Sequence, residues 1–169
     1  GPKTGAFVGP RDATLMEAFR TRAYWIMVIS TALWSMTVTA IHFHLVMLML
    51  DHGLSEGDAA RMFVTMALSM SAAFLVGGIL ADRLPLNVLL SLSKAGMLAA
   101  VLQLIAVSTV WAGHCFAVTI GIATGLIGAV TWTIWVRFYG RTHLGKIRGS
   151  LTTVGVAASS VGPFLMGSA

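Results

Sequence analysis

Residues 24–50 read YWIMVISTALWSMTVTAIHFHLVMLML and contain no Asp, Glu, Lys or Arg. Since a helix needs about 20 mostly apolar residues to cross the hydrocarbon core of a bilayer, this stretch is long enough to span one. Similar apolar segments follow at about 60–80, 88–110, 115–136 and 151–169. The mean hydropathy of +0.86 agrees with this pattern. The sequence therefore predicts an all-α, polytopic transmembrane helix bundle with about five membrane-spanning helices.

The basic residues lie mostly in alternate loops. Arg20 and Arg22 precede the first span, and further cations follow the second span in 81–87 and the fourth in 137–150. By the positive-inside rule, we expect the N-terminus and both loops to be cytoplasmic in a multi-pass protein of the cell (inner or plasma) membrane. The pI of about 10.2 then reflects topology and contact with anionic lipid, and we expect no nucleic-acid partner.

Residues 1–23 form a polar segment before the transmembrane bundle of residues 24–169. The run 12–20 predicts a short amphipathic helix capped by Asp12, in a cytoplasmic linker that rests on the inner leaflet. The connections within the bundle are short, so no domain boundary is placed there. Because the chain starts without Met and stops inside an apolar run, we expect a piece of a longer protein with a truncated last span.

The fourth span carries glycine and tryptophan on one helical face. Gly121, Gly125, Gly128, Trp132 and Trp135 recur at intervals of four, three, four and three. Small residues let helices approach closely in a bilayer, so this face is either a packing groove or the lining of a cavity along which helices slide.

The fifth span has a similar face of small residues. Thr152, Gly155, Ser159 and Gly162 share one side of the predicted helix and are followed by Pro163. Proline removes a backbone hydrogen bond, so we expect a kink there. A kinked, glycine-lined helix suits a moving or gating element.

Polar residues inside a membrane must face protein or water, which makes them the best candidates for a binding site. Thr31, Ser35, Thr39 and His42 lie within an arc of about 80° on the first span, whereas His44 points about 160° away from His42. The two histidines therefore cannot chelate one metal ion from a regular helix. His42 is the better candidate for a cavity, and the alternative is that either histidine hydrogen-bonds a neighbouring helix.

Arg137 closes the fourth span, where it either anchors to lipid phosphates or reaches into an inward-facing cavity. No span contains Asp or Glu, and no Gly-x-Ser-x-Gly or His-Glu-x-x-His arrangement lies within a span. The single Cys115 has no partner for a metal site. We therefore expect no catalytic residues, no metal and no cofactor.

The turn after the second span reads Gly78-Ile79-Leu80-Ala81-Asp82-Arg83. It resembles the Gly-x-Leu-Ala-Asp-Arg signature that the major facilitator superfamily places between its second and third helices and repeats between its eighth and ninth. The resemblance implies a conformational motif in which Gly78 permits close helix contact, Asp82 caps the next helix or pairs with a helix end, and Arg83 stays cytoplasmic. The pattern departs from the superfamily after Arg83, which favours its second copy and the C-terminal half.

Further stretches resemble monocarboxylate-carrier-like members of that superfamily. Residues 138–149 and 160–163 resemble their tenth-to-eleventh helix region, and Phe43-His44 with 51–55 resembles the end of their seventh helix. The resemblance covers about 12–169 as helices seven to eleven. It implies a missing N-terminal six-helix half and a solute site between the halves, to which His42 or His44 and Trp132 would contribute.

The favoured hypothesis is a fragment of a secondary active transporter that moves a small organic solute, with a monocarboxylate as the leading substrate, by alternating access. Its partners would be the lipid bilayer, the solute and the N-terminal half of the same transporter. The alternative is a membrane sensor or assembly subunit that has the same fold without transport. A water-lined polar stripe on the first span would favour transport, and a dry, packed stripe would favour the subunit.

Overall fold

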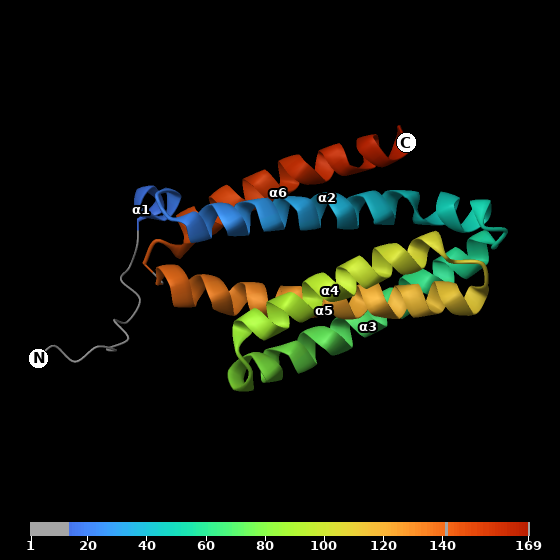
Figure 1. Ribbon diagram of the computed structural model, residues 1–169, viewed down its shortest axis with the longest axis horizontal. Helices are drawn as coiled ribbons and strands as arrows, with labels where there is room; N and C mark the ends of the chain where they lie inside the picture. The colour runs from blue at the N-terminus through green and yellow to red at the C-terminus, as the bar shows by residue number, and fades with distance from the viewer. Residues whose placement is uncertain (1–13, 141, 169) are drawn as a thin grey trace, which may run out of the picture. The chain divides into compact units, whose positions relative to one another are not determined.

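The computed structural model describes residues 14–140 and 142–168, apart from the side chains of Trp132 and Arg137. These residues form helices and no strand. In chain order the helices are α1 (Leu15–Phe19), α2 (Arg22–Asp51), α3 (Glu56–Arg83), α4 (Leu86–Ile105), α5 (Val110–Tyr139) and α6 (Leu144–Gly167). Five of them, α2 to α6, are long and apolar enough to cross a membrane, which confirms the predicted all-α bundle (Figure 1).

The chain divides into two compact units. The first unit consists of Gly1–Ile41 and Ile134–Ala169, and the second consists of His42–Thr133. The first unit therefore contains α1, the start of α2, the end of α5 and α6. The second contains the end of α2, all of α3 and α4, and most of α5.

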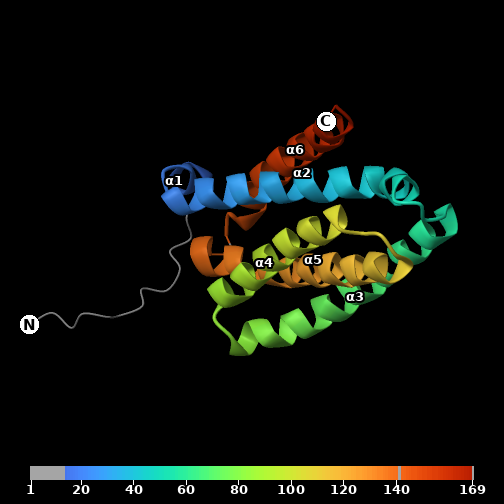
Figure 2. The ribbon, with the colours of Figure 1, turned by 45° about the vertical axis from the view of Figure 1, so that its right-hand side comes forward.

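In the first unit, α2 and α6 run side by side in the same direction (Figure 2). The Tyr24 hydroxyl lies 2.7 Å from Ser150 Oγ near the start of both helices. Further along, Gly162 of α6 lies against the backbone of Met36. The contacts advance in the same direction along both chains, so the pair is parallel.

In the second unit, α3 and α5 form another parallel pair. Gly113 faces Met62 near the start of the two helices, and Gly77 lies against α5 towards their other ends. The helix α4 connects them and contacts α5 where Gly96 lies against Ala123. Glycine at these crossings lets the backbones approach closely, which is the usual way that helices associate in lipid.

Two helices begin at capping boxes in polar segments. Thr14 caps α1 and Ser55 caps α3, and each box is completed by an acid three residues later, Glu17 and Asp58. Asp12, the predicted cap of the leader helix, lies outside the described residues, and Thr14 is the N-cap instead.

Large apolar side chains face outward on the second unit. The exposed ones on α3 and α4 include Val64, Leu68, Leu75, Ile79, Leu98, Leu102 and Ile105. Such a surface would associate in water, but it is the ordinary outer surface of a helix bundle whose solvent is lipid.

Candidate functional site

Three hydroxyl side chains form a stripe on α2 within the first unit. Thr31, Ser35 and Thr39 are spaced four residues apart and are half-buried. None of the three makes a side-chain hydrogen bond to the part of the chain that the structure describes. By contrast, Thr37 on another face of α2 donates to the Leu33 carbonyl at 2.9 Å. The hydroxyl stripe therefore retains hydrogen-bonding capacity that other membrane hydroxyls satisfy within their own helix.

The hydroxyl stripe faces a small-residue surface of α6. A Cβ added to Gly155 would lie 3.8 Å from Ser35 Oγ, which is an ordinary van der Waals separation. Gly162 is closer to α2, because a Cβ there would overlap the carbonyl of Met36. Pro163 lies inside α6, which continues beyond it to its last residue. The two predicted glycines of this span thus both face α2, but only Gly162 is essential for the approach.

The two histidines of α2 belong to the second unit, whereas the hydroxyl stripe belongs to the first. His42 and His44 are half-buried, and the His42 ring centroid lies 6.1 Å from that of Phe63. Trp132 and Arg137, the other predicted solute contacts, have side chains outside those described. Within residues 14–140 and 142–168, no group of three or more His, Cys, Asp or Glu side chains could hold a metal ion.

The glycine face of α5 lies against α3 in the second unit. A Cβ at Gly121 would lie 2.7 Å from a backbone carbonyl oxygen of α3. One at Gly125 would lie 2.8 Å from Ala73 Cβ, and one at Gly128 would lie 3.2 Å from the Phe74 ring. These contacts favour the packing interpretation of this face over a cavity lining.

The turn between α3 and α4 differs in detail from the expectation. A Cβ at Gly78 would meet nothing within 4 Å, and the close approach to α5 is made by its neighbour Gly77. Asp82 and Arg83 are exposed. The N-cap of α4 is Pro85, which makes no side-chain capping bond, so Asp82 does not cap this helix.

A hydrogen bond that the sequence does not predict joins α3 to α5. Thr65 Oγ1 lies 2.9 Å from His114 Nδ1 and also donates to the Arg61 carbonyl at 3.1 Å. A threonine hydroxyl has one proton, so Thr65 accepts from His114, and Nδ1 of the imidazole is the protonated nitrogen. The sequence carries no signal for this pair, because the pairing depends on the parallel register of the two helices.

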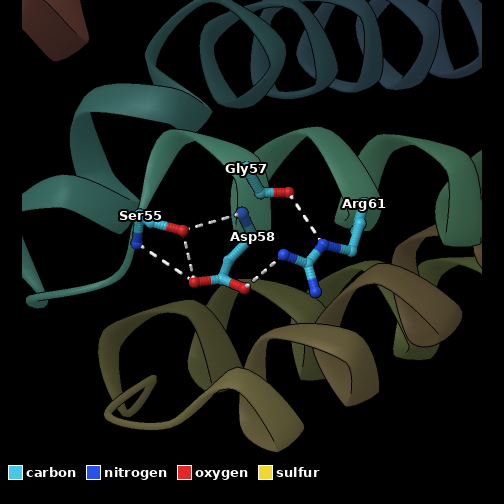
Figure 3. Close-up of polar contacts among 4 residues, drawn as sticks. All are labelled: Ser55, Gly57, Asp58 and Arg61. Carbon is cyan, nitrogen blue, oxygen red and sulfur yellow. Dashed lines mark hydrogen bonds and ion pairs between the residues drawn. The ribbon is translucent and has the colours of Figure 1, made fainter.

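A polar cluster surrounds the start of α3 (Figure 3). The Asp58 carboxylate accepts from Ser55 Oγ at 2.6 Å and from the Ser55 backbone N–H at 3.2 Å. Arg61 lies 3.6 Å from Asp58 and donates to the Gly57 carbonyl at 3.2 Å. The polar groups of this cluster hydrogen-bond one another, so the cluster caps the first turn of α3 and is not a ligand site.

Comparison with known families finds a match. The model described as Major Facilitator Superfamily matches residues 2–163, nearly the whole chain. No curated protein matches the chain significantly.

Proposed function

This chain belongs to the Major Facilitator Superfamily, and from that membership we propose that it forms part of a secondary active transporter that moves a small organic solute by alternating access. The chain is a multi-pass membrane protein of the transporter type, as its five apolar helices and the family match require. The membership of the Major Facilitator Superfamily that the sequence predicts is thereby confirmed. The proposal adds a mechanism and a substrate class, with a monocarboxylate as the leading candidate.

The hydroxyl stripe of α2 is the observation that carries the proposal. Water is scarce inside a membrane, so hydroxyls that make no hydrogen bond within the described residues are available to a polar solute. A carboxylate accepts hydrogen bonds from hydroxyl donors, and Ser35 and Thr39 would supply two of them one helical turn apart. The resemblance to monocarboxylate carriers supports the same class of solute, with His42 or His44 as a further contact.

We also propose that an N-terminal six-helix half completes the solute site and that the basic loops 81–87 and 137–150 face the cytoplasm. In superfamilies built from repeats, solute binds near the midplane at the interface between the repeats. The described chain would then hold one side of the site, and it would transport nothing alone.

A membrane sensor or assembly subunit is the alternative. The separation between Ser35 and the site of a Cβ on Gly155 leaves room for simple packing of α2 on α6. In that case the hydroxyl stripe would serve the helix interface and no solute would bind.

Uptake of a radiolabelled monocarboxylate into liposomes tests the proposal, using the complete transporter that contains this chain. We expect uptake driven by a pH gradient, and the pair Ser35→Ala and Thr39→Val should raise KM by about thirtyfold, since each lost hydrogen bond contributes about 1 kcal/mol. Thr37→Val is the matched control, because its hydroxyl is bound to Leu33, and it should leave KM unchanged. No uptake with or without the gradient would refute the substrate class.

Labelling of cysteines introduced at 52–57, in a Cys115→Ser background that removes the exposed native thiol, tests the orientation. We expect reaction only from the outer side of the membrane. Reaction from the cytoplasmic side alone would invert the topology.

A further inference from the structure

Aromatic side chains of α1 and of the first turn of α2 form a corner in the first unit, where the ribbon of α1 lies beside the start of α2 (Figure 1). The ring of Phe19 meets Tyr24 edge-on at 5.0 Å between centroids and stacks with Trp25 at 6.3 Å. The Trp25 indole N–H donates to the Phe19 carbonyl at 2.9 Å. A helix as short as α1 is not stable alone, so these contacts hold it in place.

Hydrogen bonds tie the aromatic corner to the neighbouring helices of the same unit. Thr21 Oγ1 lies 2.9 Å from the Tyr139 hydroxyl at the end of α5, and the Tyr24 hydroxyl lies 2.7 Å from Ser150 Oγ on α6. Hydrogen bonds to α5 and α6 therefore fix the position and orientation of the aromatic corner within the first unit.

The outer face of the corner combines apolar side chains with cations. Met16 is 65% exposed and Trp25 is 52% exposed, and the Trp25 N–H is already satisfied. Arg20 and Arg22 are also exposed, and they lie between Met16 and Trp25 in the chain. Tryptophan and basic side chains together are typical of segments that lie at the level of lipid headgroups.

The start of α6 adds positive charge at the same end. Lys146 is exposed, and it lies four residues, or about 6 Å along the helix, before Ser150. Arg22 lies two residues, or about 3 Å, before Tyr24, the partner of Ser150. Arg22 and Lys146 therefore lie at similar levels along α2 and α6, so both can contact the same layer of lipid headgroups.

Negative charge is scarce on this surface. Glu17 is the single acid among the described residues of the first unit, and Thr14 binds its carboxylate through both its backbone N–H and its hydroxyl. Arg20, Arg22 and Lys146 form no ion pair with a carboxylate of the described chain. The surface is thus complementary to an anionic partner that lies in the plane of the bilayer.

We propose that Met16, Trp25, Arg20, Arg22 and Lys146 form a corner surface that binds the headgroups of anionic phospholipids. Met16 and Trp25 would enter the interfacial layer, and the three cations would contact lipid phosphates. The binding would anchor the paired ends of α2 and α6 to the membrane surface. It does not depend on the solute or on transport.

A fluorophore on α1 tests this in the full chain. The fluorophore nitrobenzoxadiazole is attached to the thiol that Met16→Cys introduces, and Cys115→Ser removes the exposed native thiol. The labelled protein is placed in nanodiscs that contain brominated lipid, which quenches the fluorophore on contact. Brominated phosphatidylglycerol should quench the probe well beyond its mole fraction, and brominated phosphatidylcholine should not. Each surface cation is expected to contribute about fivefold in relative affinity, so replacing all three by Gln should remove a preference of roughly 100-fold.

Control variants separate charge from folding. Arg20→Lys with Arg22→Lys keeps the charge and should keep the preference, and Arg61→Gln at the start of α3 should leave it unchanged. High salt should weaken the preference, since the contacts are exposed. Equal quenching by both lipids in the parent would overturn the proposal. Loss of the quenching on addition of free glycerol phosphate would also overturn it, because the surface would then bind soluble phosphate.

Discussion

Replacement of Gly125 by alanine tests how closely α3 and α5 pack. The added Cβ would lie 2.8 Å from both Ala73 Cβ and Phe74 N, and the Met70 carbonyl oxygen would be closer still. Ordinary contacts begin at 3.4 Å, so the helices must separate by at least 3.4 − 2.8 = 0.6 Å. Two of these neighbours are backbone atoms that cannot rotate away. Overpacking costs about 1–3 kcal/mol. Because backbone atoms are in the way, we expect Gly125→Ala to lower the free energy of unfolding by about 3 kcal/mol.

Gly78→Ala is the matched control for Gly125→Ala. A Cβ at Gly78 meets nothing within 4 Å, and the gain in helix propensity is the same in both variants. The assay is unfolding of the purified protein in mixed micelles with increasing sodium dodecyl sulfate, followed by circular dichroism. Equal unfolding free energies for the two variants, within about 0.5 kcal/mol, would show that α3 and α5 do not pack as described.

Two further predictions concern hydrogen bonds. Thr65→Val should lower the free energy of unfolding by about 1 kcal/mol, because the bond to His114 is lost. It should also release His114 from its single tautomer, which ¹⁵N NMR of the imidazole would detect. An unchanged tautomer would contradict the assignment of the proton to Nδ1. Hydrogen bonds from the Thr14 backbone N–H and, to a smaller extent, from its side chain lower the pKa of Glu17. The stability that the Thr14–Glu17 capping box gives to α1 is therefore present above about pH 4.3 and is lost as the pH falls through the lowered pKa. Thr14→Ala should raise that pKa in a ¹³C carboxyl titration, and an unchanged titration would disagree with the box.

The fold class could be predicted from the sequence because bilayer thickness imposes a length on apolar segments. Helix ends could not be predicted as well: α3 begins at Glu56 although its apolar segment starts near residue 60. Hydropathy counts apolar residues, whereas helices begin where polar caps such as Ser55 satisfy the first N–H groups.

The candidate site could be predicted only in part. The hydroxyl stripe follows from helical periodicity, so the sequence alone is enough to place Ser35 and Thr39 on one face of their helix. Which of Gly77 and Gly78 approaches α5 depends on how two distant helices are rotated against each other. The Thr65–His114 bond is beyond sequence reasoning for the same reason, since its partners come from different helices.

The bond between Tyr24 and Ser150 joins residues that are 126 positions apart. At a translation rate of about 5–20 residues per second, α2 enters the membrane about 6–25 s before its partner on α6 is synthesised. During that interval Tyr24 has no Ser150 to pair with, and Gly155 and Gly162 are not yet present to pack against α2. The parallel pair of α2 and α6 therefore forms only after α3, α4 and α5 have been synthesised.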